Sequence, residues 1–236
     1  TVAVELSKPG SYCSGTLIDK SHVVTAAHCL KQLGEYVKFG DQTSESKESV
    51  KILHSFSHPN YECNIEENDI AILEIESPTK ATFTSKVELA KSEDQYLTDQ
   101  EFVAAGFGYT SAGSVSQDGR LRKIKGNLES NIAYSKRVLI HQFGSDRATP
   151  LGTCFGDSGG PLYIINSNQT LKLIGVTAYG IDDRDCAGLA GATDIRAHLP
   201  WITSVLTKTP FNPDSNLCDN TTDDSKLPKP PSDEVL

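Results

Sequence analysis

The sequence lacks any apolar run near the ~20 residues that a transmembrane helix needs, which argues against a membrane-spanning protein. It is also poor in positive charge: 22 lysines and arginines face 31 acidic residues, so the net charge is −9. Without a basic stripe to neutralise phosphates, we expect neither nucleic acid nor an anionic membrane among its main partners. No Cys-x-x-Cys pair is present, so a structural zinc site is not expected.

Methionine is absent altogether, and the sequence opens at Thr1 with no charged and then apolar leader. We therefore expect a processed or excerpted chain from which any signal peptide has been removed. Its 236 residues suffice for one large domain or two small ones that share an interface.

Cysteine usage indicates an oxidising compartment. The six cysteines are Cys13, Cys29, Cys63, Cys154, Cys186 and Cys218. An even count fits three disulfides, although the count leaves their pairing open. Asn168 and Asn220 each begin an N-glycosylation triplet. We expect a secreted, extracellular glycoprotein.

Many short apolar or alternating stretches predict strands, separated by glycine-rich turns. These stretches are residues 1–6, 13–19, 22–25, 36–39, 50–56, 69–75, 102–105, 121–128, 137–142, 162–165, 171–178 and 188–195. Residues 77–99 are predicted to be a long connection and residues 197–207 a helix, with Pro200 in its first turn. The Pro/Asp-rich residues 209–236 are predicted to be mostly disordered. The pattern indicates an all-β barrel or sandwich.

Three segments carry residues that are able to do chemistry, and each alone has a plainer interpretation. Ser158 lies among three glycines, which suits a nucleophile beside an oxyanion hole, or else a simple turn between strands. His28 follows small residues and is equally compatible with a core histidine. Asp69 opens an apolar strand, where an acid needs a partner or caps the strand end.

The loop of residues 41–49 contains Asp41, Glu45 and Glu48, which offer the oxygen atoms that calcium prefers. They follow no EF-hand pattern, so a solvated loop is the favoured interpretation. We expect no metal and no other cofactor.

Taken together, three blocks resemble the signatures of the chymotrypsin-like (trypsin-fold) serine proteases, in that family's order of His, Asp and Ser. The blocks are Thr25-Ala26-Ala27-His28-Cys29, Asn68-Asp69-Ile70-Ala71-Ile72-Leu73 and Gly156-Asp157-Ser158-Gly159-Gly160-Pro161. The resemblance covers about residues 1–206. It implies an all-β, double six-stranded antiparallel β-barrel with a C-terminal helix. The protease domain would be residues 1–208, with barrels at about 1–95 and 96–208.

The resemblance also implies roles. Ser158 would be the nucleophile, His28 the general base and Asp69 the residue that orients His28. Backbone N–H groups of Gly156 and Ser158 would form the oxyanion hole. The implied function is a secreted serine endopeptidase that acts through an acyl-enzyme. Its expected partners are protein or peptide substrates and protein protease inhibitors, and we expect a monomer.

Two cysteine pairs, Cys13–Cys29 and Cys154–Cys186, resemble family disulfides. Cys63 and Cys218 remain, so we pair them by elimination.

By the same resemblance, the base of the specificity pocket is Gly152, where trypsin-like members carry Asp. The walls would be Ala178-Tyr179-Gly180 and Gly191. Glycines on the walls leave room for a large side chain, so we predict cleavage after apolar or aromatic residues. Acidic residues lie just past the wall and keep a broad or basic preference open: Asp182, Asp183 and Asp185.

Two departures from the family pattern stand out. The family's mature Ile-Val-Gly-Gly segment, whose amino terminus pairs with the acid before the nucleophile, is not in this sequence. That acid is Asp157, so the chain is trimmed, zymogen-like, or has another partner for Asp157. Ala178 stands where the family has a serine that supports the triad aspartate.

Two alternatives complete the hypotheses. A non-catalytic or zymogen-like homologue would act as a binding protein, although such homologues usually lose a triad residue. An α/β-hydrolase esterase would need its histidine after the serine, for which His198 is available. No parallel βαβ pattern surrounds His198, so the esterase is rejected.

Overall fold

The computed structural model describes residues 1–46, 48–61, 67–77, 87–97, 99–111, 117–129, 137–143, 152–180, 186 and 188–212. Several predictions fall outside these residues: the pairing of Cys63 with Cys218, the glycosylation triplet at Asn220, the acids Asp182, Asp183 and Asp185, and the disorder of residues 213–236.

Strands β1 to β6 form a closed barrel. In their order around it, they are β1 (Val2–Leu6), β2 (Tyr12–Leu17), β3 (His22–Thr25), β6 (Ala71–Ile75), β5 (Glu48–Ser57) and β4 (Leu33–Phe39). All pairings are antiparallel. Apolar residues on the inner face of these strands, such as Val4, Val24 and Ile72, are fully buried.

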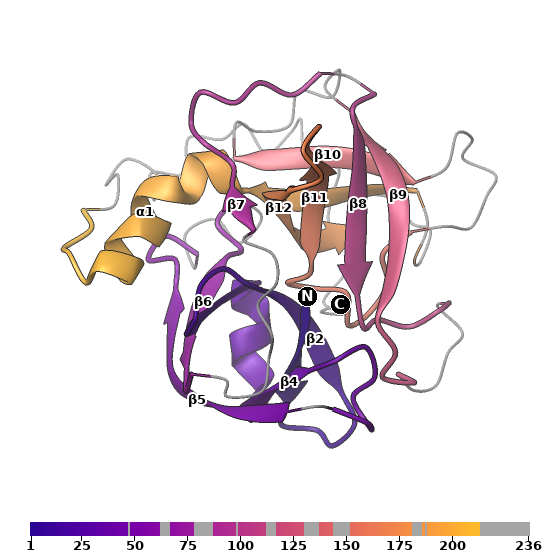
Figure 1. Cartoon of the computed structure of the whole chain (residues 1–236), viewed down its shortest axis with the longest axis vertical. Coiled ribbons are helices and arrows are strands. Elements are labelled where there is room, and N and C mark those ends of the chain that lie inside the picture. Colours follow the sequence, from indigo (N-terminus) through magenta and orange to yellow (C-terminus); the bar gives the residue numbers. More distant parts are fainter. Residues whose placement is uncertain are drawn as a thin grey trace, which may run out of the picture.

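A second sheet holds the remaining strands. In sheet order they are β11 (Pro161–Ile165), β8 (Glu101–Gly106), β9 (Arg122–Leu128), β10 (Val138–Phe143), β13 (Leu189–Asp194), β12 (Leu171–Gly180) and β7 (Glu88–Leu89). The pairing of β11 with β12 closes six of these strands, and β7 adds to β12 in parallel. The predicted double six-stranded barrel is therefore confirmed, and Figure 1 shows one barrel above the other.

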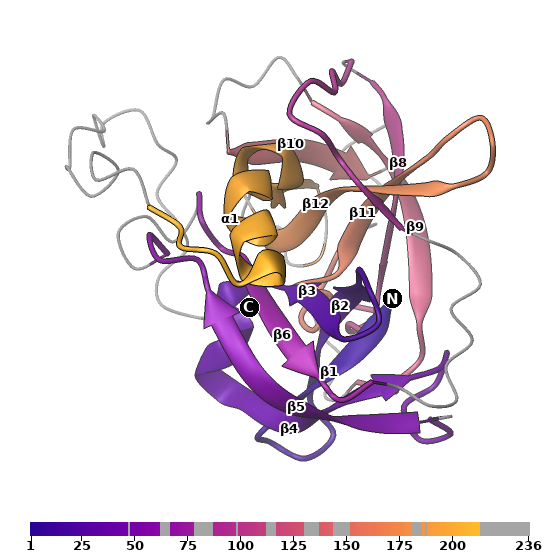
Figure 2. The ribbon, with the colours of Figure 1, turned by 60° about the vertical axis from the view of Figure 1, so that its left-hand side comes forward.

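The C-terminal helix α1 spans Ile195–Thr207 and begins two residues before the predicted start. It begins there because the Asp194 side chain caps it by accepting a hydrogen bond from Arg196 N. Pro200 therefore lies inside the helix, not in its first turn. Figure 2 shows α1 beside β12, where the two barrels meet. No helix in the described part of the chain is long and apolar enough to cross a bilayer.

Local differences from the prediction have simple causes. The segment after β3 forms a 3₁₀ helix, η1 (Ala27–Gln32), which the strand pattern did not predict. β7 lies within the predicted connection, because a two-residue strand is too short to show a period. β6 begins at Ala71, so Asp69 precedes the strand instead of opening it.

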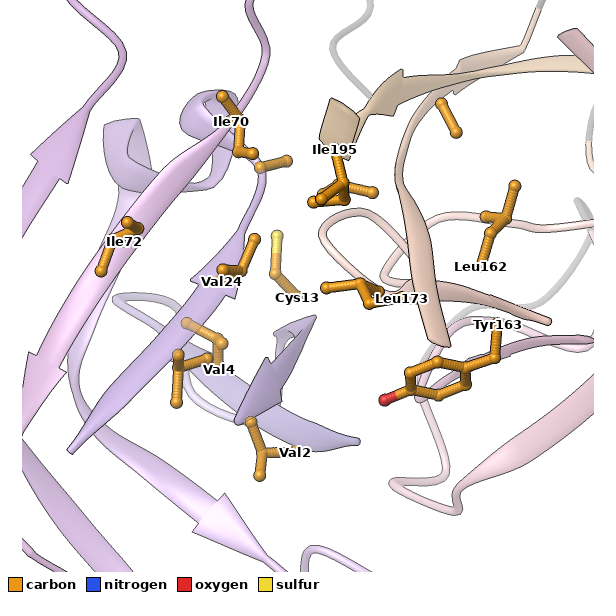
Figure 3. Packing of buried hydrophobic residues seen from close by; sticks show 14 of the residues in the cluster. Val2, Val4, Cys13, Val24, Ile70, Ile72, Leu162, Tyr163, Leu173 and Ile195 are labelled. Atoms are coloured by element: carbon orange, nitrogen blue, oxygen red, sulfur yellow. The ribbon is translucent and has the colours of Figure 1, made fainter. Parts of the chain in front are cut away.

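One buried apolar cluster contains residues from both barrels. Figure 3 shows Val24 and Ile70 of the first barrel facing Ile195 and Leu173 of the second. Since burial of apolar surface contributes about 25 cal/mol per Å², this shared core fixes the two barrels against each other. The loops of the two barrels that meet at this junction therefore keep a fixed position relative to one another.

Candidate active site

His28 and Asp69 come together because β3 pairs with β6. In that pairing Thr25 lies opposite Ala71, so the residues just after β3 and just before β6 meet at one end of the barrel. The His28 backbone N–H donates to Asp69 Oδ1 at 2.9 Å, and His28 Nδ1 lies 2.6 Å from Asp69 Oδ2. Two contacts to one carboxylate fix both the backbone and the ring of His28.

The pKa of His28 is raised above its usual range. Burial of the imidazole is the largest single influence and acts to lower it, but the charge of Asp69 and its hydrogen bond together outweigh burial. Lys31 opposes them weakly. The pair is thus suited to a ring that takes up a proton during a reaction.

Asp69 is buried and is held from the second barrel as well. Thr193 Oγ1 donates a 2.9 Å hydrogen bond to the backbone carbonyl of Asp69. Ala178, where the resemblance leads one to expect a serine, is also buried and has no hydroxyl to offer. Support for Asp69 in this chain therefore includes a bond to its backbone from β13.

Ser158 lies just before β11, and its backbone is attached to the first barrel. The Ser158 carbonyl accepts a 2.8 Å hydrogen bond from Ser14 N of β2. The next residue, Gly159, has φ +79°, and a β-carbon there would overlap Thr25 Oγ1. The loop that carries Ser158 is therefore packed directly against the end of β3 that leads to His28.

The peptide between Phe155 and Gly156 has a fixed orientation. Tyr109 N donates to the Phe155 carbonyl at 2.9 Å. In a trans peptide the N–H points opposite to the C=O, so Gly156 N–H points away from Tyr109. Across the described residues, neither Gly156 N nor Ser158 N donates to a neighbour. These two free donors are the groups that an oxyanion hole requires.

His28 Nε2 is buried and has no hydrogen-bond partner among the described residues, Ser158 included. His28 is thus hydrogen-bonded directly to Asp69. Ser158 is linked to the same end of the first barrel by the bond from Ser14 N to its carbonyl and by the packing of Gly159 against Thr25. Hydrogen bonds between a base and its nucleophile often shorten only when substrate is bound.

The carboxylate of the partly buried Asp157 is bound by two backbone N–H groups. Its Oδ1 accepts from Gly108 N and its Oδ2 from Cys154 N, both at 2.9 Å. Burial raises the pKa of this carboxyl, while the two N–H groups and the charge of Arg122 act to lower it. A cavity of about 280 Å³ adjoins the carboxyl and is lined in part by Arg122 and Gly152.

The predicted wall residues of the pocket lie on the paired strands β12 and β13, whereas Gly152 lies in the loop before β11. Tyr179 and Gly180 of β12 lie opposite Gly191 and Ala190 of β13. The Tyr179 ring covers Gly191, because a β-carbon on that glycine would lie 2.6 Å from the ring. Tyr179 therefore occupies the space that the glycine was expected to leave open.

The two disulfides described by the structure are Cys13–Cys29 and Cys154–Cys186. The first joins β2 to η1 beside His28, and the second joins the loop before Ser158 to the segment before β13. One group of potential metal ligands is found among the described residues, Cys13, His28 and Cys29, but both sulfurs belong to the disulfide.

Sequence reasoning missed several supporting residues. Ser14 Oγ donates to Gly156 O at 2.9 Å and accepts from Phe107 N at 3.0 Å, so it joins the two loops around Ser158. Thr193 and Gln117 also lie at this junction. A buried polar residue within an apolar strand was the available signal for Ser14 and Thr193.

Comparisons with known proteins agree with this geometry. The family model described as Trypsin matches residues 1–202. The chain is 30% identical over 210 residues to an ovochymase from Halocynthia roretzi, which covers 81% of this chain but only 13% of the ovochymase. It is 31% identical over 196 residues to a trypsin from Saccharopolyspora erythraea, covering 76% of this chain and 80% of that protein. The chain therefore belongs to the trypsin family of serine proteases, which have the chymotrypsin fold.

Proposed function

We propose that the chain is a secreted serine endopeptidase that hydrolyses peptide bonds through an acyl-enzyme. The proposal is supported by the hydrogen-bonded His28–Asp69 pair and by the packing of the Ser158 loop against the end of β3 that leads to His28. Within the described part of the chain, the N–H groups of Ser158 and Gly156 make no hydrogen bond. Family membership supports it, since members are typically endopeptidases.

In this proposal each group has one task. Ser158 Oγ attacks the substrate carbonyl carbon while His28 Nε2 takes its proton, and His28 then gives that proton to the leaving amine. The carboxylate of Asp69 stabilises the imidazolium and holds its tautomer. Gly156 N–H and Ser158 N–H bind the oxyanion, and loss of one such donor typically costs about 3–4 kcal/mol. Water then attacks the acyl-enzyme with His28 again acting as base.

Asp157 and its cavity are the proposed activation site. A partly buried carboxylate beside a cavity of about 280 Å³ is stabilised by a cation placed there. We assign that place to the amino terminus of an activated chain, so the protein would be made as a zymogen. Pairing would hold Asp157 and, with it, the Gly156–Ser158 loop.

For specificity, we propose a pocket with Gly152 at its base and Ala178, Tyr179, Gly180 and Gly191 on its walls. None of these residues carries a charge, which favours apolar or aromatic residues before the scissile bond. The Tyr179 ring lies over Gly191 and limits the depth available there.

The two disulfides support an extracellular location, where protein or peptide substrates and protein inhibitors would be the partners of a monomer.

A fluorophosphonate probe tests the proposal, because it reacts only with a serine that a base activates. Wild-type protein should be labelled, whereas Ser158→Ala and His28→Ala should not. Labelling of wild type and Ser158→Ala alike would contradict the proposed nucleophile. A folded wild type that stays unlabelled even after proteolytic activation would instead indicate the non-catalytic homologue, whereas labelling that appears only after activation would support the zymogen.

A further inference from the structure

One edge of β2 carries backbone groups that point away from its partner strand β1. Leu6 N donates to Ser11 O, so the next pair, Glu5 and Tyr12, is one in which backbone groups point away from the partner strand. The N–H and C=O of Tyr12 therefore face outward, as do those of Ser14 two residues on. Ser14 N bonds to Ser158 O and its carbonyl accepts from Thr25 Oγ1.

At Tyr12, the backbone N–H and C=O are bonded to the side-chain amide of Gln117, in the position where a neighbouring strand would otherwise pair. Its N–H donates to Gln117 Oε1 at 2.7 Å, and its carbonyl accepts from Gln117 Nε2 at 3.0 Å. One primary amide thus satisfies both groups of one residue, which is the pair of bonds that a neighbouring peptide backbone would make.

The same amide lies against the proposed oxyanion hole. Gln117 Nε2 also donates to Phe107 O at 2.9 Å, and a β-carbon on Gly156 would overlap that nitrogen. Gln117 therefore lies between the edge of β2 and the loop that carries Ser158, and its side chain is only partly buried.

The position corresponds to the leaving-group side of a bound peptide. The proposed pocket walls, on β12 of the second barrel, contact residues before the scissile bond. β2 belongs to the first barrel and lies with the Cys13–Cys29 disulfide next to His28, which hands its proton to the departing amine. A substrate that continues past the scissile bond therefore extends toward Tyr12.

We propose that the Gln117 side-chain amide is a built-in competitor for this stretch of substrate. An extended peptide must displace it from Tyr12, so Gln117 weakens the binding of the residues that follow the scissile bond. The inference rests on the proposed function.

Two substrates with the same residues before the scissile bond test the inference. One is an anilide with nothing beyond the bond, and the other is an internally quenched peptide with three residues beyond it. Gln117→Leu removes the amide but keeps the bulk. The ratio of kcat/KM for the extended over the short substrate should rise about tenfold, since two neutral hydrogen bonds no longer compete.

Gln42→Ala is the control, because among the described residues the exposed amide of Gln42 bonds only to a nearby side chain, Ser44 Oγ. Its ratio should equal that of wild type. A ratio that is unchanged or lower in Gln117→Leu overturns the inference. An equal fall in kcat/KM for both substrates also overturns the inference, because it would show that Gln117 only supports Gly156.

Peptide-binding measurements test this inference independently of the proposed catalytic function. If wild type cleaves neither substrate, the proposed function fails, yet fluorescent versions of both peptides can be bound to Ser158→Ala. Addition of Gln117→Leu to that variant should tighten the extended peptide about tenfold relative to the short one. Equal affinities for both peptides, before and after the substitution, would overturn the inference.

Discussion

Thr193 Oγ1 donates a 2.9 Å hydrogen bond to the backbone carbonyl of Asp69. Both residues are buried, and 124 positions separate them in the sequence. The bond joins a strand of the second barrel to the acid that orients His28 in the first. It makes the position of Asp69 dependent on how the two barrels pack.

Thr193→Val should therefore destabilise the protein and slow its chemistry. The variant keeps the shape of the side chain but leaves a buried carbonyl without its donor, at a cost of about 1–3 kcal/mol. Urea unfolding measures this loss, and the rate of fluorophosphonate labelling reports the displacement of Asp69. Thr193→Ser retains the hydroxyl and should label at nearly the wild-type rate; equal rates in all three proteins would argue against the coupling.

The pH dependence of labelling should follow His28. The ring must be neutral to act as a base, so the rate is high above its pKa and falls as the pH drops through it. Since Asp69 raises that pKa, the fall should be centred above 6.5. In Asp69→Asn burial still acts to lower the pKa, so the midpoint should move below 6.5, with a rate loss on the order of 10⁴-fold. An unmoved midpoint would show that another group titrates.

Gly106 packs so closely against the carboxylate of Asp157 that it leaves no room for a side chain. A β-carbon at Gly106 would overlap Asp157 Oδ1 and lie 2.9 Å from Ser14 Oγ. Gly106→Ala should cost about 1–3 kcal/mol in the free energy of unfolding and slow labelling, because Asp157 adjoins Ser158. Gly10→Asn is the control, since Gly10 has open space around it and Asn tolerates its φ of +78°.

His141 should make stability depend on pH. It is buried between Phe102 and Phe143, and burial lowers its pKa to about 4. Its neutral form thus stabilises the fold above the unfolded pKa of 6.5, and that stability is lost as the pH falls toward 4, by up to about 3 kcal/mol.

His141→Phe should flatten this slope in urea titrations between pH 6.5 and 4. Some slope should remain, because the pKa values of His58 and His198 are lowered as well, to about 3 and about 4. A slope identical to that of wild type would contradict the assignment to His141.

Charge at the pocket base should change specificity. Gly152→Asp places a carboxylate where the family resemblance puts the basic-residue determinant, so cleavage after Arg relative to Phe should rise roughly 30-fold or more. A peptide library measures the change, and Gly152→Asn separates charge from size. Strong Arg preference in the wild-type protein would contradict the neutral pocket.

The sequence alone determined the family and the candidate chemistry. His28, Asp69 and Ser158 lie in local blocks whose wording and order are specific, because a nucleophile, a base and close backbone packing each restrict the residues nearby. The alternation of apolar and polar residues located most strands, because a strand with one face in a core points successive side chains alternately into the core and toward solvent. Two-residue β7 and helix η1 carry too few residues for any period to appear.

Tertiary structure alone decided which ordinary residues support that chemistry. Thr193 on Asp69, Ser14 on Gly156 and Gln117 on Tyr12 are contacts between residues 105 or more positions apart in the sequence. Likewise, the ring of Tyr179 fills the space beside Gly191 only because β12 and β13 pair in that register. A threonine or glutamine has no local signature of such a role; closure of the barrels and the packing between them bring its partner within reach.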